Sequence, residues 1–265
     1  MNRLIRGEVI RLFATRLPAW SAVAAVAAGA MMTGLLSLVG PENSSPPMPG
    51  LDTPEGVGIV LGINGMLLFI PALIGTIAIT GEYRHRTIGA TFLVAPRRGR
   101  VLWAKLLVYG LLGLAYGMVT AAAAGLALSG AAAIRSTPLG VSSPELGGLL
   151  VGLALAAAVY TVIGVAIGAL ARHQLVAIGV VLGFFYFLEP LLMIMPGVNA
   201  VYPYLPGGAT AALLDFTFLS DAVAAEMPIA APQILSALGG AAILLAYAAL
   251  ASVVAVAFPL RRDLA

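Results

Sequence analysis

The sequence predicts an all-α integral membrane protein with six transmembrane helices. Three observations lead to this prediction: the composition, the length of the apolar stretches, and the placement of the basic residues between them. Of the 265 residues, 61% are hydrophobic and only 9% are charged, and the mean hydropathy is +1.03. Because an ordinary globular domain is about 45–50% apolar and about 25% charged, a soluble fold cannot bury this much apolar surface.

Six stretches are long enough to cross a bilayer, which needs a helix of roughly 20 apolar residues. We expect these spans at residues 18–40, 57–80, 101–130, 146–170, 174–196 and 234–260, within a single domain that covers residues 1–265. The third span exceeds the thickness of a bilayer and should tilt or extend into water. Pro71 cannot donate a backbone hydrogen bond and should kink the second span.

The basic residues give the expected orientation. With a cytoplasmic N-terminus, thirteen of the fourteen Lys and Arg residues fall on the cytoplasmic side, and only Arg135 falls outside. Such an excess of basic residues marks the cytoplasmic side of membrane proteins. We therefore expect both termini in the cytoplasm. The richness in Ala, Gly and Arg suggests a bacterial source, which makes the cytoplasmic (inner) membrane the expected location.

Two segments outside the spans are expected to form short helices. In residues 1–17, Ile5, Val9, Leu12 and Phe13 share one helical sector, which predicts an interfacial helix on the cytoplasmic face; a plain basic leader is the alternative. In the outer segment, residues 197–233, the stretch "GGATAALLDFTFL" is too short to cross the bilayer and favours a re-entrant or surface helix.

The loop between spans two and three is the most distinctive segment. Residues 81–107, "GEYRHRTIGATFLVAPRRGRVLWAKLL", hold six of the fourteen basic side chains. Glu82 and Arg86 stand at positions i and i+4, and apolar residues recur at helical spacing, which predicts a short amphipathic helix that Pro96 ends. The basic cluster that follows Pro96 is explained adequately if its charges only set the orientation in the membrane and contact anionic lipid. A helix that docks on a cytoplasmic partner explains the whole segment better.

This segment resembles the first cytoplasmic loop of the permeases of ATP-binding-cassette (ABC) type-2 exporters. The matching residues are Glu82, Tyr83, Arg84, Thr87, Ile88, Pro96, Arg97 and Lys105. The six spans and "FLEPLLMIMPG…YLPGGATAAL", which begins near the end of span five, are also similar to this family. Arg86 departs from the pattern, because relatives often carry a small residue there.

The resemblance implies a transport subunit that is not itself an enzyme. The 81–100 loop would contain a coupling helix that contacts a cytoplasmic ATPase, through Glu82, Tyr83, Arg84, His85, Thr87 and Ile88. Two ATPase subunits would bind ATP and Mg²⁺, this chain would bind no cofactor, and a second permease copy, identical or different, would complete the substrate path within membrane lipid. The residues agree: a P-loop needs Gly before its Lys, but the only lysine, Lys105, follows Ala104.

Polar residues inside the spans are candidates for the substrate path or an outer gate. Glu189 is the one carboxylate within a predicted span, and a charge there is costly enough to suggest a function. The structural alternative is that Glu189 snorkels outward or caps an outer helix. Asn64 and Tyr160 are weaker candidates, because most polar residues within spans serve packing.

Other functional classes fit less well. A non-transporting membrane anchor or sensor that recruits a cytoplasmic partner remains the main alternative to a transporter. An intramembrane protease would need a nucleophile and a base that can meet, but Ser129 lies near the outer end of span three and both histidines lie on the opposite side. His85 and His173 are too few for a metal site, and no feature points to nucleic acid.

Overall fold

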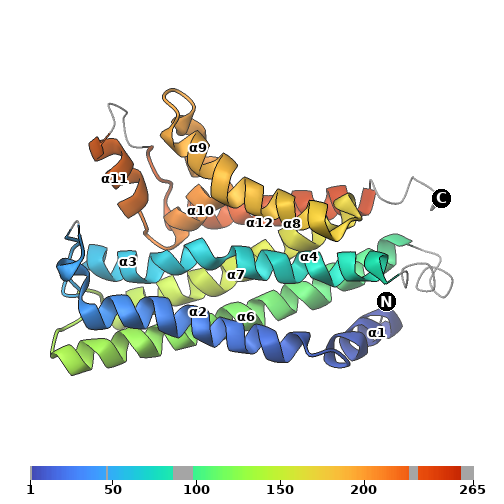
Figure 1. Ribbon diagram of the computed structural model, residues 1–265, viewed down its shortest axis with the longest axis horizontal. Helices are drawn as coiled ribbons and strands as arrows, with labels where there is room; N and C mark the ends of the chain where they lie inside the picture. The colour runs from blue at the N-terminus through green and yellow to red at the C-terminus, as the bar shows by residue number, and fades with distance from the viewer. Residues whose placement is uncertain (1, 46, 86–97, 227–231, 258–265) are drawn as a thin grey trace.

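The computed structural model describes residues 2–45, 47–85, 98–226 and 232–257, and these residues form helices and turns without a strand. Among the described residues, six helical segments are long and apolar enough to cross a membrane, which confirms the predicted number of spans. They run side by side along the long axis of the molecule (Figure 1). Four are single helices: α2 (Leu17–Val39), α6 (Arg98–Arg135), α7 (Ser143–Ala171) and α12 (Ala237–Ala257).

The other two spans are interrupted. Span two consists of α3 (Pro54–Gly62), a 3₁₀ segment η2 (Ile63–Leu67) and α4 (Phe69–Arg84). Span five consists of α8 (Gln174–Gly183), a π-helical turn η3 (Phe184–Leu188) and α9 (Glu189–Ile194). The interruption of span two agrees with the expected effect of Pro71: without an N–H, Pro71 cannot bond to the carbonyl of Leu67, the last residue of η2.

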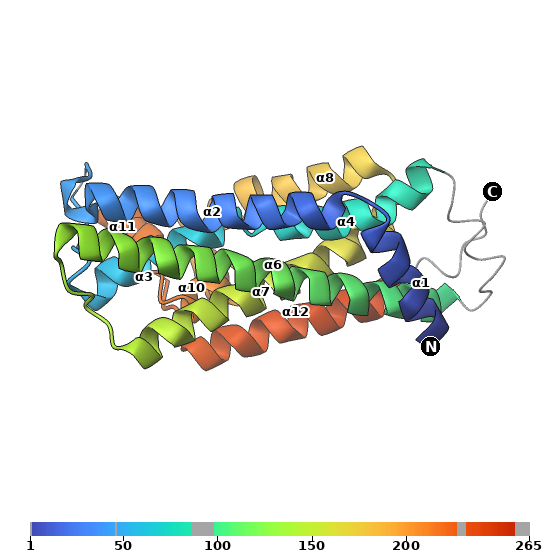
Figure 2. The same cartoon turned by 90° about the horizontal axis from the view of Figure 1, so that it is seen from below.

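The two ends of the bundle differ in what they carry. The helix α1 (Asn2–Phe13), the end of α4, the start of α6 and the end of α12 lie at one end (Figures 1 and 2). We call this the α1 end. The loop before α7 and the short helices η1 (Pro41–Asn43), α10 (Pro206–Leu213) and α11 (Phe218–Glu226) lie at the other end. The short helices predicted between spans five and six are therefore present, as η4 (Asn199–Tyr204), α10 and α11.

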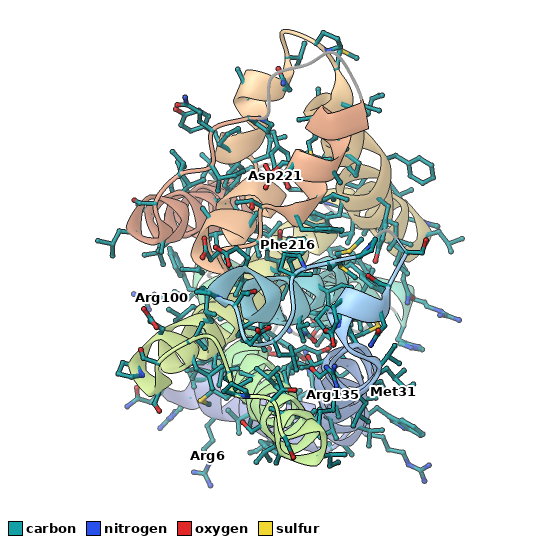
Figure 3. All side chains as sticks on the ribbon, turned by 90° about the vertical axis from the view of Figure 1, so that its left-hand side faces the viewer. Arg6, Met31, Arg100, Arg135, Phe216 and Asp221 are labelled. Carbon is teal, nitrogen blue, oxygen red and sulfur yellow. The ribbon has the colours of Figure 1, made fainter. Side chains whose placement is uncertain are left out.

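Arg135, the basic residue predicted on the outer side, lies at the end opposite α1 (Figure 3). Its guanidinium forms an ion pair with Glu42 and donates a hydrogen bond of 3.2 Å to the carbonyl oxygen of Ser37. Hydrogen bonds from the Glu42 backbone and from the Arg135 side chain lower the pKa of the Glu42 carboxyl. The ion pair with Glu42 offsets the positive charge of Arg135 at this end. Among the described residues, the excess of basic side chains therefore lies at the α1 end.

The core forms around α7, which packs against α4, α6 and α12. Small residues allow the closest contacts. A Cβ atom placed on Gly164 of α7 lies 1.9 Å from the backbone oxygen of Ala72, and one placed on Gly75 of α4 lies 2.1 Å from the oxygen of Thr161. Such close approach of backbones is the usual basis of helix packing in membranes.

Two helices begin at caps that their sequences specify. Ser142 Oγ accepts the N–H of Glu145 at 3.4 Å, and Glu145 Oε2 accepts the N–H of Ser142 at 2.7 Å, which forms a capping box before α7. Thr53 Oγ1 accepts the N–H of Gly56 at 3.1 Å before α3. Both caps lie at the end opposite α1. There they accept hydrogen bonds from backbone N–H groups in the first turns of α7 and α3, which have no partner within the helix.

The helix α1 confirms helical structure in the N-terminal segment, but its position at a membrane surface stays a prediction. Leu12 packs into the core, whereas Phe13 and Ile10 are 71% and 60% exposed. The side of α1 that faces the bundle carries Leu12 together with Glu8, which is also buried. The apolar sector expected from Ile5, Val9, Leu12 and Phe13 is therefore divided between the core and the exposed surface.

Replacing Gly164 with Ala should destabilise the fold, because the new methyl group meets the backbone of α4 and not a movable side chain. We expect a loss of about 1–3 kcal/mol, the usual cost of overpacking, and a lower Tm in a detergent thermal-shift assay. Gly179→Ala on α8 is the matched control, because nothing lies within 4 Å of a Cβ at that position. Equal Tm values for the two variants would contradict the close α4–α7 contact.

Candidate functional site

Four charged side chains from three helices meet at the α1 end. They are Glu8 and Arg11 of α1, Glu82 of α4 and Lys105 of α6, and we call them the Lys105 cluster. Lys105 is 2% exposed, Glu8 5% and Glu82 6%. A buried lysine is rare unless it is paired, so the cluster is a specific feature of the fold.

The ammonium group of Lys105 is the centre of the cluster. Lys105 Nζ lies 2.8 Å from Glu8 Oε2 and forms a second ion pair with Glu82 Oε1. Arg11 pairs with the same oxygen of Glu82, and its Nη1 lies 3.7 Å from Glu8 Oε1. Two carboxylates thus face two cations, and charge-assisted hydrogen bonds offset the cost of removing them from water.

The cluster joins both ends of the predicted coupling loop. Glu82 stands near the end of α4, at the beginning of the 81–100 loop, and Lys105 lies in the first turns of α6, just after the loop. Each of them pairs with α1, so the two ends of the loop and the N-terminal helix are held together. The neighbouring core contains Leu12, Leu102 and Leu106 from two of the same three helices.

The structure separates the predicted coupling residues into groups. Glu82, Tyr83 and Arg84 belong to the last turn of α4, not to a separate helix, and His85 ends it. Glu82 is buried and Tyr83 is half-buried, whereas Arg84 and His85 are exposed. Arg84 Nη1 donates a hydrogen bond of 3.2 Å to Gln174 Oε1. Thr87, Ile88 and the rest of the predicted amphipathic helix lie outside the described residues, so that helix stays a prediction.

Glu8 is not among the site residues that the sequence predicts. Glu8 and Lys105 are 97 residues apart, and no local pattern connects them. A signal was nevertheless present: Glu8 is the one acid among the basic residues before the first span, and Lys105 is the one lysine of the chain. Isolated charges of opposite sign next to apolar spans are candidates for a buried pair.

A second feature is a cavity of about 130 Å³ on the side away from the Lys105 cluster. It lies between the two interrupted spans and α10. Aromatic side chains form much of its wall: Phe69, Tyr160, Phe185, Tyr186, Tyr202 and Phe216. Tyr202 lies outside the spans, and burial, followed by the nearby Glu189 carboxylate, raises the pKa of its hydroxyl, which therefore stays protonated at neutral pH.

The two irregular segments contact each other beside this cavity, which we call the aromatic cavity. The hydroxyl of Tyr186 in η3 donates a hydrogen bond of 3.1 Å to the carbonyl oxygen of Met66 in η2. The rings of Phe69 and Tyr186 meet edge to face, with centroids 5.3 Å apart. Helical irregularities of this kind often occur at functional sites, and a side chain that satisfies a carbonyl helps the backbone to tolerate them.

Glu189 lines the aromatic cavity and also caps a helix. Its side chain is 4% exposed, and its Oε1 accepts the N–H of Gly207 at 2.5 Å, in the first turn of α10. A carboxylate at a helix N-terminus is stabilised by the helix dipole. The alternative that Glu189 caps an outer helix is therefore present in the structure, and the same carboxylate faces the cavity.

Tyr160 and Asn64, the weaker candidates, occupy different places. Tyr160 lines the aromatic cavity and stacks on Phe185 with ring centroids 4.9 Å apart. Its hydroxyl oxygen accepts a hydrogen bond of 3.3 Å from Thr210 Oγ1. Asn64 instead points away from the cavity. Its Nδ2 donates to Thr33 Oγ1 of α2 at 2.8 Å, so it connects span one to span two within the core.

Replacing Lys105 with Met should strongly destabilise the fold, because it leaves Glu8 and Glu82 buried with Arg11 as the only described cation of the cluster. Breaking a buried ion pair costs about 3–5 kcal/mol, which a thermal-shift assay would detect as a large loss of Tm. The double variant Glu8→Gln/Lys105→Met restores the charge balance and should recover part of the loss. Arg100→Ala, an exposed change on α6, is the control. Additive effects of the two cluster changes would contradict the Glu8–Lys105 contact.

Comparison with known proteins identifies the family. The model of the ABC-2 family transporter protein matches residues 14–189, which is more than half of the chain. A search of curated proteins finds no match. The matched range begins just after α1 and ends at Glu189, so it includes Glu82, Lys105, the first four spans and most of the fifth. This chain, with its six apolar helices, belongs to the ABC-2 family of membrane transporter proteins.

Proposed function

We propose that this chain is the permease subunit of an ATP-driven exporter. In this proposal it forms the substrate path as a dimer with a second permease copy, identical or different, in a bacterial cytoplasmic membrane with both termini inside. Two cytoplasmic ATPase subunits hold ATP and Mg²⁺ and drive it through the 81–100 loop. The family supports the permease role, and the Lys105 cluster is the observation that supports coupling through this loop.

The cluster supports coupling because it makes the ends of the loop move together. An ATPase that displaces the loop applies force to the end of α4 and the start of α6. Lys105 and Glu82 join these two helices, and Glu8 and Arg11 join both to α1. Because a packed, ion-paired unit shifts as one body and not by gradual deformation, the displacement would be passed on to the bundle.

The buried position of Glu82 changes the role that we propose for it. A carboxylate enclosed by Lys105 and Arg11 serves as a positioning residue for the loop and not as a contact to the ATPase. Arg84 and His85 are exposed beside the loop and remain the proposed contact residues, together with Tyr83, Thr87 and Ile88. The basic character of the α1 end favours an acidic partner surface and anionic lipid.

Span two offers a route from the loop to the aromatic cavity. The helix α4 runs without interruption from Glu82 to Phe69, and Phe69 lines the cavity beside η2. The 3₁₀ segment η2 allows α4 to shift relative to α3, and its contact with η3 carries such a shift to span five. This spatial continuity supports the proposal that a displacement of the loop reaches the cavity.

A non-transporting anchor or sensor is the alternative function. Purification of the tagged chain from its own host in mild detergent, with mass spectrometry of what remains bound, separates the two functions. We expect a stoichiometric chain that carries a P-loop. Recovery of the protein alone, or with a partner that has no P-loop, would contradict the transporter proposal and favour the anchor.

The variant Arg84→Glu/His85→Glu should reduce ATPase binding or the stimulation of ATPase turnover by this chain, because it reverses the charge of exposed groups beside the loop. We expect about a tenfold loss, comparable to the effect of removing an important interface contact, with an unchanged Tm. Arg6→Glu is the matched control: Arg6 is exposed on α1 at the same end and extends away from the bundle (Figure 3). Equal losses in both variants would point to general charge attraction instead of a contact at the loop.

A further inference from the structure

The aromatic cavity carries an acid without a basic neighbour. Glu189 is the one acidic residue in its wall, and no Lys, Arg or His is found among the residues that line it. Nor does Glu189 form an ion pair with any residue that the structure describes. At the α1 end, by contrast, the buried carboxylates Glu8 and Glu82 are each matched by a cation.

The hydrogen bonding from α10 leaves part of the Glu189 carboxylate available to a ligand. A carboxylate has about four lone-pair sites; the N–H of Gly207 occupies one of them on Oε1 and the N–H of Gly208 also interacts with the carboxylate, so the remaining sites can accept a ligand. The N-terminus of a helix supplies roughly half of a positive charge, so the pairing with α10 reduces the negative charge at the cavity but does not cancel it. A ligand with a full positive charge would complete the neutralisation.

The aromatic wall adds a second preference for cations. The faces of Tyr, Phe and Trp attract ammonium groups through their quadrupole, and rings arranged around a cavity are the usual site for quaternary ammonium ligands. Here four rings of the wall also contact one another: Phe69 and Tyr186 meet edge to face, and Tyr160 stacks on Phe185. Phe216 lies over Gly62, where a Cβ would be 2.4 Å from the ring of Phe216.

The size of the cavity limits the ligand. A volume of about 130 Å³ is similar to the cavity of about 150 Å³ that accepts a single benzene ring in a well-studied engineered protein. The exposed fraction of Tyr186, 42%, places one edge of the cavity at the surface of the chain. We propose that the aromatic cavity binds a compact organic ammonium cation, held by Glu189 and the surrounding rings. Its role as cargo rests on the proposed permease function, whereas its binding does not.

The test is calorimetric titration of the full chain, without an ATPase, in nanodiscs of zwitterionic lipid, with empty nanodiscs as the reference. The probe is benzylammonium, and the comparison ligands of similar size are benzyl alcohol, which is neutral, and benzoate, which is anionic. We expect saturable binding of the cation, and no comparable binding of the other two. Equal binding of benzyl alcohol would overturn the proposal and leave a simple apolar cavity.

Two variants test the residues. Glu189→Gln keeps an oxygen for the N–H of Gly207 but removes the charge, and it should weaken cation binding about tenfold or more, the value of a charge-assisted contact. Phe185→Leu keeps an apolar wall but removes a ring, and it should weaken binding about fivefold. Asp221→Asn, an exposed acid on α11 at the same end, should leave binding unchanged (Figure 3).

The possible results are distinct. Unchanged affinity in Glu189→Gln, or no cation binding by the folded wild type, would overturn the proposal. If Glu189→Gln lowers the Tm because α10 loses its cap, the Phe185→Leu variant decides: selective loss of the cation supports the aromatic site, and no loss overturns it. Because these titrations contain no ATPase, their failure leaves the proposed exporter function untouched, and an absent ATPase partner leaves the cation site untouched.

Discussion

The pairing of Lys105 with Glu8 and Glu82 is the interaction on which the α1 end of the protein depends. A buried ammonium group costs several kcal/mol unless it is paired, so α6 can pack against the bundle only when α1 and α4 bring their carboxylates to it. The requirement fixes the position of α1, which otherwise has only Leu12 as a deep apolar anchor. It also links the two ends of the loop that the proposed ATPase would move.

Backbone satisfaction is the corresponding constraint within the two interrupted spans. At membrane depth, a break in a helix is tolerated only where protein groups satisfy the freed carbonyls. The breaks η2 and η3 lie against each other, and the hydroxyl of Tyr186 bonds to the carbonyl of Met66. Their irregular shape leaves the space between them that the aromatic side chains line. The cavity is therefore a product of the same local backbone geometry that interrupts both spans.

The Lys105 cluster and the aromatic cavity use carboxylates in opposite ways. Glu8 and Glu82 are enclosed by cations and contribute to a closed, charge-balanced unit. Glu189 is as deeply buried, but its described partner is a backbone N–H of α10 and its wall is aromatic. The Glu189 side chain can therefore cap α10 and contact a ligand in the cavity at the same time. Any ligand that pulls on Glu189 would also act on α10, which packs against α7 and α12.

The sequence alone predicted the six spans, the sidedness of the basic residues and the interruption near Pro71, because span length, charge and proline geometry are local properties. It also identified Glu82, Lys105 and Glu189 as unusual residues, and named Tyr160 as a weaker candidate. It placed Glu82 on an accessible helix, did not identify Glu8, and gave no sign of the π-helical turn. Those features were decided by the tertiary structure, because the partner of a buried charge depends on how helices far apart in the chain rotate and pack against one another.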